Sequence, residues 1–168
     1  KKDRECNMEI IKQLYDINRL FENVDDFGPA YESFLKVSNV ELGYRGLEGR
    51  LNEYFEDVRQ TAICIATRGQ AGNGNINFFM SGIKRVKSFM YQEKYQIEEA
   101  IKDASRAAYL ASCFEKGVLA IEKYPKDKPE VVLTMEISDA LPTKLRKLRS
   151  VIPEAYYYWA KVDELLKL

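Results

Sequence analysis

A file of charged residues runs along the stretch IIKQLYDINRL, residues 10–20. Lys12, Asp16 and Arg19 follow one another at spacings of four and three residues, so they share one face of an α-helix. A lysine beside a carboxylate could bind a phosphate group and orient a second reactant. Charges of alternating sign at this spacing are also typical of a solvated helix face, where each pair contributes only about 0.2–0.5 kcal/mol. The spacing alone leaves both interpretations open.

The periodicity of the apolar residues predicts which side of this helix is buried. Ile10, Leu14, Ile17 and Phe21 recur at helical spacing, and they lie roughly opposite the charged file. We therefore expect this apolar stripe to face the core and the charged file to face away from it.

Two basic segments further along the chain could contact a nucleic acid. The residues concerned are Lys84, Arg85 and Lys87 in GIKRVKSF, and Lys144 and Lys147 in PTKLRKLRS. If the two segments meet in space, they would form a basic groove suited to an RNA backbone. Two ordinary solvated faces are the alternative interpretation.

The other candidate patterns favour structural roles. The loop RGQAGNGN, residues 68–75, matches neither G-x-G-x-x-G nor G-x-x-x-x-G-K-[ST], so it predicts an interhelical loop in which Gly and Asn permit positive φ. The aromatic run of residues 156–159 could stack on bases, but a terminal amphipathic helix more often buries such rings.

Composition excludes several classes of site. The 168 residues contain no histidine, and Lys plus Arg equals Asp plus Glu at 26 each, so catalysis by a histidine base and a global attraction to nucleic acid are both excluded. The three cysteines are far apart, which predicts neither a metal site nor a disulfide framework. No apolar run reaches the ~20 residues of a membrane helix. We expect a protein of the reducing cytoplasm that folds without metal.

Helical periodicity extends over almost the whole chain and predicts an all-α fold, an irregular bundle of six to eight helices forming one domain over residues 1–168. The helices are expected at about 10–22, 29–45, 51–68, 75–92, 96–121 and 153–168, with residues 130–138 as a further helix. The segment 96–121 carries a stripe of alanines that would let a neighbouring helix approach closely, so it is expected to be the central helix.

Several segments carry a resemblance to a known family. The stretch KKDRECNMEIIKQLYDINRLFENVDDF resembles the region that follows the catalytic core in the AbiEii/AbiGii family of nucleotidyltransferase-like toxins, which act in abortive infection and type IV toxin–antitoxin systems. ELGYRGL, TAICIATRG and PEAYYYW are similar to later parts of the same family. The resemblance implies a C-terminal helical domain whose upstream catalytic core is absent, because the chain has no Gly-Ser turn and no Asp-x-Asp motif.

The resemblance also implies a function. A full-length parent would transfer a nucleotide from a Mg²⁺-bound nucleoside triphosphate to an acceptor, either a tRNA end or a protein. Lys12 would contact phosphate, and Asp16 would orient the phosphate or the acceptor. A cognate antitoxin would be a partner, whereas this portion alone would bind no cofactor and catalyse no transfer. A stand-alone helical module that binds another protein is the alternative interpretation.

Overall fold

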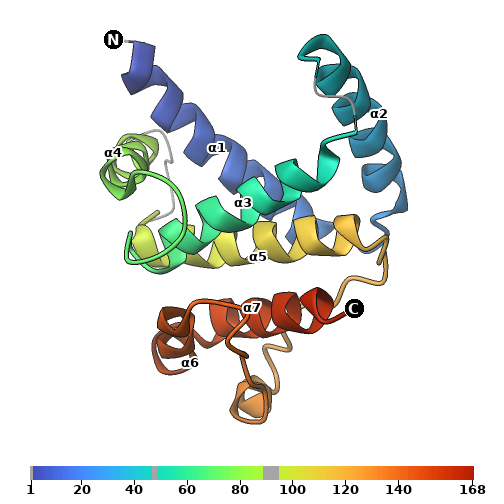
Figure 1. Ribbon diagram of the computed structural model, residues 1–168. Helices are drawn as coiled ribbons and strands as arrows, with labels where there is room; N and C mark the ends of the chain where they lie inside the picture. The colour runs from blue at the N-terminus through green and yellow to red at the C-terminus, as the bar shows by residue number, and fades with distance from the viewer. Residues whose placement is uncertain (1, 47–48, 89–94) are drawn as a thin grey trace.

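The computed structural model describes residues 2–46, 49–88 and 95–168, with side chains from Cys6 onward. These residues form helices and no strand, so the predicted all-α class is confirmed (Figure 1). The α-helices are α1 (Lys2–Asn23), α2 (Gly28–Tyr44), α3 (Leu51–Ala66), α4 (Ile76–Val86), α5 (Ile97–Glu115), α6 (Leu148–Val151) and α7 (Pro153–Leu166). Two short 3-10 helices, η1 (Pro129–Leu133) and η2 (Thr143–Lys147), precede α6. No helix within these ranges has the length and apolar character needed to cross a membrane.

Helix α5 lies at the centre of the bundle, as its alanine stripe predicts. It packs against α3, α7 and α1. Ala100, Ala104 and Ala108 are almost completely buried, because small side chains allow the neighbouring helices to approach the α5 backbone. The sequence-based end of this helix near residue 121 is wrong. Gly117, at φ +65°, ends the helix six residues earlier in a left-handed turn.

The capping hydrogen bonds explain where α5 ends. The amide of Val118 donates to the carbonyl of Cys113 at 2.8 Å, and the amide of Gly117 donates to Phe114 at 3.2 Å. These two bonds form a Schellman motif, which satisfies the last carbonyls of the helix and requires a residue that accepts positive φ.

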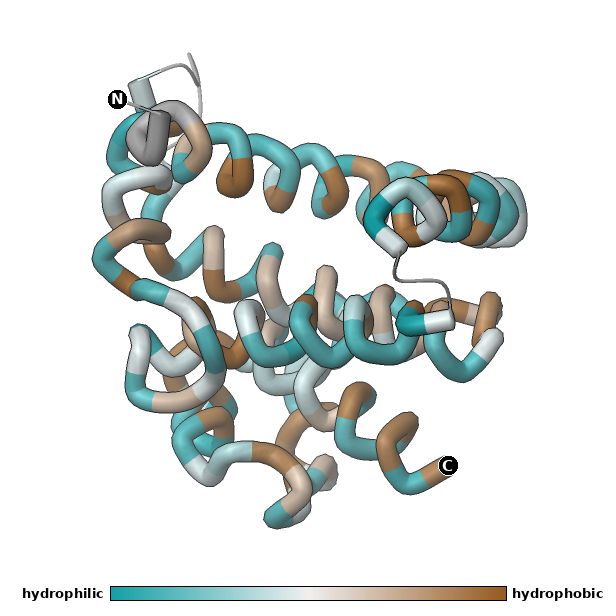
Figure 2. Tube along the Cα trace, turned by 45° about the horizontal axis from the view of Figure 1, so that its top comes forward, coloured by the Kyte–Doolittle hydropathy of each residue, from teal (hydrophilic) through white to brown (hydrophobic). Residues whose placement is uncertain are grey.

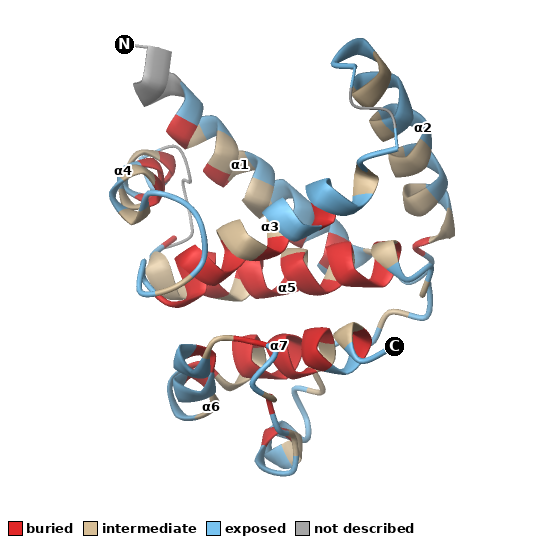
Figure 3. Cartoon of the chain, viewed as in Figure 1, coloured by how far each residue is buried: buried red, intermediate tan, exposed pale blue. Residues whose placement is uncertain are grey.

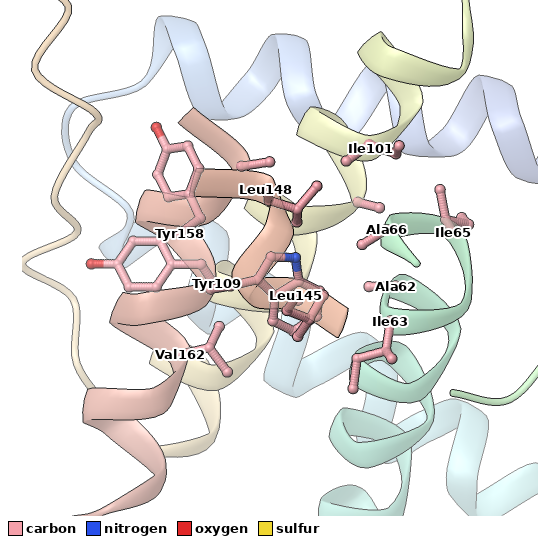
Figure 4. Close-up of a cluster of buried hydrophobic side chains, with 14 of the residues drawn as sticks. Ala62, Ile63, Ile65, Ala66, Ile101, Tyr109, Leu145, Leu148, Tyr158 and Val162 are labelled. Carbon is pink, nitrogen blue, oxygen red and sulfur yellow. The ribbon is translucent and has the colours of Figure 1, made fainter. Parts of the chain in front are cut away.

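The core is formed where α3, α5 and α7 meet (Figure 4). Ala66 of α3 lies near Ile101 of α5, while on the other side Tyr109 of α5 packs against Tyr158 of α7 with ring centroids 5.7 Å apart. The four residues of the aromatic run 156–159 are all buried. The prediction that these rings pack in the core is confirmed.

The buried side of α1 differs from the predicted stripe. Ile11 and Phe21 are buried, as is the polar Asn18, whereas Ile10 is only half-buried and Ile17 is 41% exposed. The reason is that α1 packs along two different helices, α4 at its beginning and α5 towards its end. Hydrophobic and hydrophilic positions alternate along the helices of the bundle in Figure 2. The line of contact is therefore rotated from the stripe that the sequence suggests.

Helix α4 begins as predicted. The side chain of Asn75 accepts hydrogen bonds from the amides of Asn77 and Phe78, which is the usual function of an N-cap residue. Gly82 allows α4 to approach α1 closely, because a Cβ at this position would lie 2.4 Å from the carbonyl oxygen of Asn7. The predicted extension of this helix to residue 92 lies partly outside the described residues.

Residues 130–138 do not form the α-helix that we expected. The 3-10 helix η1 is followed by extended chain up to Ser138. Asp163 of α7 explains why this extended chain is stable, since its carboxylate accepts hydrogen bonds from the amide and the hydroxyl of Ser138 at 3.1 and 2.6 Å. A buried side chain of α7 thus supplies the partners that a helix would otherwise have provided.

Candidate functional site: an apolar groove beside α2

Helix α2 contributes no buried residue, unlike α5 and α7 (Figure 3). It leans away from the bundle and touches mainly α3. The glycine–proline pair Gly28–Pro29 opens the helix, and the side chain of Asp26 accepts a hydrogen bond from the amide of Gly28 at 2.9 Å. The turn therefore fixes the direction in which α2 leaves α1, and it leaves one face of α2 uncovered.

Phe34 of α2 forms the floor of the space between α2 and the bundle. Its ring centroid lies 5.8 Å from that of Tyr54, 5.5 Å from that of Phe55 and 5.7 Å from that of Phe114. Rings at these separations contribute about 0.5–1.5 kcal/mol per pair beyond the area that they bury. This aromatic cluster holds α2 in place while leaving the rest of its apolar face accessible.

Two adjoining cavities above this floor make one groove. The first has a volume of about 540 Å³ and runs along α2, and the second, of about 240 Å³, reaches down to α5. Leu20, Ala30, Phe34 and Tyr54 line both cavities. We call this continuous surface the α2 groove. Val37 and Leu20 on its walls are 63% and 46% exposed.

Among the described residues that line the α2 groove, the charged ones are Glu41 and Arg45 of α2, which form a long ion pair of 4.0 Å. Partial burial, with the nearby carboxylate of Asp57, raises the pKa of Tyr54 above its usual value. The phenol therefore remains neutral at physiological pH. A groove with an apolar interior and a rim of both signs can bind an apolar surface.

Lys12 and Asp16 differ in their exposure on α1. Lys12 is half-buried and forms an ion pair with Glu9 at 3.1 Å, whereas Asp16 is exposed. The exposure of Asp16 is typical of a solvated helix face. Within the described residues, no three His, Cys, Asp or Glu side chains gather where they could share a metal ion. The catalytic roles of Lys12 and Asp16 stay a prediction.

The two basic segments lie in different parts of the molecule. Lys84, Arg85 and Lys87 belong to α4 and the turn after it, which pack against α1, whereas Lys144 and Lys147 belong to η2, which packs against α6 and α7. Arg85 donates a hydrogen bond to the side chain of Asn7. The structure therefore does not join these segments into the single groove that we considered.

Lys144 and Lys147 instead lie beside the glycine-rich loop. With Arg68 and Gln70 of that loop they surround a pocket of about 190 Å³, whose apolar wall includes Ile101. Arg68 forms an ion pair with Glu98 at 2.8 Å. The glycine-rich loop adopts positive φ at its three glycines, as predicted.

Sequence reasoning missed the α2 groove. The relevant signal was present, because α2 carries the apolar residues Val37, Val40 and Tyr44 on one face and Tyr31, Leu35 and Leu42 on another. A helix of this kind needs cover on two sides. The sequence does not show what covers these faces, and only the structure shows that the described residues leave Val37, Val40 and Tyr44 exposed.

Comparisons with known proteins give one similarity. The chain is 30% identical over 138 residues to the 20S-pre-rRNA D-site endonuclease NOB1 of Saccharomyces cerevisiae, and the match covers 70% of this chain and 30% of that protein. The chain therefore spans less than a third of the length of this relative. No protein-family model matches the chain, and no solved structure matches it either.

These findings overturn the resemblance to the AbiEii/AbiGii nucleotidyltransferase-like toxins. The similarity found is to an endonuclease, and no family model supports a nucleotidyltransferase. The quoted motif KQLYDI lies on α1, where the alternation of charged and apolar residues is what any amphipathic helix displays. The Mg²⁺, the nucleoside triphosphate and the antitoxin that the resemblance implied therefore lose their basis.

Proposed function

We propose that this chain is a helical module that binds another protein, and that the α2 groove receives an amphipathic helix of that partner. The observation that carries the proposal is the uncovered apolar face of α2 above the aromatic floor. Exposed apolar surfaces rimmed by polar residues are typical of protein–protein contacts. An amphipathic helix laid between two helices is a common way to cover such a surface.

The dimensions of the α2 groove suit a helix. Helix α2 has 17 residues, which corresponds to a length of about 25 Å. A partner helix of about four turns could place apolar residues at i, i+3 or i+4, and i+7 along it. Leu20, Val37 and Tyr54, from three different helices, would contact these residues. The charges of both signs at the rim favour a partner whose polar face also carries both signs.

Photo-crosslinking from the groove tests the proposal. A photoreactive phenylalanine analogue is placed at Val37, inside the groove, and in a matched control at Glu32, which is exposed on α2 but does not line the groove. We expect Val37 to crosslink in cells to one partner, within a segment that has helical amphipathic periodicity. The same segment as a synthetic peptide should bind the wild-type chain.

Substitution of Val37 then measures how much the α2 groove contributes to the affinity for the peptide. Val37→Asp should weaken peptide binding by about tenfold or more, because about 1.4 kcal/mol of apolar burial is lost and a charge must be desolvated. Equal crosslinking from Val37 and Glu32 would contradict the proposal. So would crosslinks from Val37 only to a second copy of this chain.

RNA contact is a second candidate function, favoured by a different observation. The similar yeast protein is named for its action on 20S pre-rRNA, and Lys144, Lys147 and Arg68 surround one pocket. We infer that these residues could contact an RNA backbone. A double variant, Lys144→Glu with Lys147→Glu, should weaken binding to single-stranded RNA and reduce its salt dependence. Val37→Asp should leave RNA binding unchanged, and RNA binding that ignores the lysine substitutions would contradict this candidate.

We propose the reducing cytoplasm as the setting of the chain. Cys64 and Cys113 are buried free thiols, and Cys6 is an exposed free thiol. Burial raises the pKa of Cys113 to about 11, although a hydrogen bond with Tyr109 opposes the shift. Unpaired cysteines of this kind suit a compartment that keeps thiols reduced.

A further inference from the structure

The pocket beside the glycine-rich loop has an aliphatic interior. It has a volume of about 190 Å³, and we call it the η2 pocket. Its apolar lining comes from the end of α3, from α5 and from the segment around α6, and consists of Ala66, Ile101, Leu148, Val151 and Ile152. All of these are buried except Val151, which is 65% exposed. No aromatic ring is among the described residues that line the η2 pocket.

The charged residues around the η2 pocket are all of one sign. Lys144 and Lys147 of η2 line it together with Arg68 of the glycine-rich loop, and the described residues that line it include no carboxylate. A 3-10 helix has about three residues per turn, so two lysines three positions apart share one face. Like charges on one face repel each other. An anion bound beside both lysines would remove this repulsion.

The arginines that neighbour these lysines in the sequence have acidic partners, whereas the lysines do not. Arg146 forms an ion pair with Asp139 at 2.6 Å, and Arg149 forms one with Glu136 at 3.2 Å. Within the part of the chain that the structure describes, the side chains of the two lysines make no ion pair and no hydrogen bond, and both are exposed. The uncompensated positive charge of this segment therefore lies at the η2 pocket.

We propose that the η2 pocket binds a small amphipathic anion, which is a ligand with a phosphate or carboxylate head and a short aliphatic chain. The chain would contact Ile101, Leu148 and Val151, and the head would lie beside the ammonium groups of the two lysines. The volume favours a short chain, because drug-sized ligands occupy about 300–1,000 Å³. The aliphatic lining favours a chain over a nucleobase, since bases usually stack on aromatic rings.

This inference goes beyond the RNA contact considered above. An RNA backbone would meet the same two lysines, but it would leave the aliphatic interior of the η2 pocket uncovered. A small amphipathic anion uses both the positive charge and the apolar surface. The two proposals share the lysines and can fail separately, because only the amphipathic anion requires the aliphatic interior.

Calorimetric titration of the purified chain at neutral pH tests the proposal with matched probes. Hexyl phosphate and hexanoate, the two hexyl anions, carry both a negative head and a chain. Inorganic phosphate lacks the chain, hexanol lacks the charge, and hexylammonium carries the opposite charge. We expect saturable one-to-one binding of a hexyl anion, tighter for the phosphate because it carries about two negative charges. The three other probes should not saturate up to about 10 mM.

Chain length and substitutions then assign the binding to the η2 pocket. Butyl phosphate should bind about tenfold more weakly than hexyl phosphate, because two methylene groups are lost. Lys144→Gln with Lys147→Gln should reduce the affinity for the hexyl anions at least about tenfold. The matched pair Lys116→Gln with Lys128→Gln, which changes exposed lysines outside the pocket, should leave it unchanged. Val151→Ser should weaken binding of hexyl phosphate about threefold or more through lost apolar contact.

Thermal melting of each variant checks that it is folded, which we expect because all the substituted side chains are exposed. The proposal is overturned if neither hexyl anion saturates up to about 10 mM, or if the two lysine pairs have equal effects. Equal affinities for hexyl phosphate and inorganic phosphate would also overturn it, because they would show an effect of surface charge alone. Equal affinities for hexyl phosphate and hexanol would show that the lysines do not select an anion.

Discussion

Replacing Asp103 by asparagine should make the stability of the protein less dependent on pH. Asparagine has nearly the same shape and can still accept the hydrogen bond from Tyr95, but it carries no charge. Asp103 is only 3% exposed, so water screens its charge little. The variant therefore isolates the cost of ionising one buried group.

The sign and size of the effect follow from the two pKa values. The pKa of Asp103 is about 7 in the folded chain against 3.8 for the ordinary carboxyl group. Between these values the folded state binds more protons than the unfolded state, so stability falls as pH rises. The full loss is about 4 kcal/mol for a difference of about three pH units, and roughly 2–3 kcal/mol of it lies between pH 5 and pH 8.

Urea denaturation of both proteins at pH 5, 6.5 and 8 measures this effect. We expect Asp103→Asn to gain roughly 2–3 kcal/mol relative to the wild type over this range, because all other titrating groups are shared and cancel. A difference in unfolding free energy that stays constant from pH 5 to pH 8 would refute the reasoning, since it would mean that Asp103 does not titrate there.

Four further substitutions have expected outcomes. Gly72→Ala should lower the free energy of unfolding by about 2 kcal/mol or more, because Gly72 has φ +78° and a Cβ there would lie 2.4 Å from the carbonyl oxygen of Gln60. Gly117 has φ +65° but open space around it, so Gly117→Ala should cost only about 1 kcal/mol, as measured by thermal melting. Val37→Asp should change the free energy of unfolding by about 0.5 kcal/mol or less, but it should lower the fluorescence of a dye that binds apolar surfaces. Unchanged dye binding would count against an open α2 groove. Asp16→Ala should also stay within about 0.5 kcal/mol, as for a solvated position, and a larger loss in urea melts would show that this face of α1 is buried.

Local patterns were sufficient for the helices whose ends are set by neighbouring residues. Asn75 signals the start of α4, and Pro153 signals the start of α7, because a cap and a proline act within one turn. The alanine stripe of α5 identified the central helix, since small side chains in a row indicate close approach. The end of α5 was misjudged by six residues because apolar residues continue beyond Gly117.

The amphipathic pattern of residues 10–20 predicted the buried face of α1 only in part. On α1 it identified a charged face and an apolar face, yet Asn18 is buried and Ile17 is 41% exposed. The reason is that α1 contacts two helices of different direction, and no periodicity within α1 encodes which neighbour lies where. The same limit explains why the basic segments could not be placed relative to each other from the sequence.

The sequence by itself determined the class of the fold, the absence of histidine chemistry and the identity of the central helix, because composition and helical periodicity act along the chain. Only the tertiary structure decided that α2 is left with an uncovered apolar face, and that Tyr95, Asp103 and Arg106 meet Asn18 of α1 around one cleft. Burial is a property of packing between distant segments. It raises the pKa of Asp103, an effect that a lone aspartate in a helical sequence does not reveal.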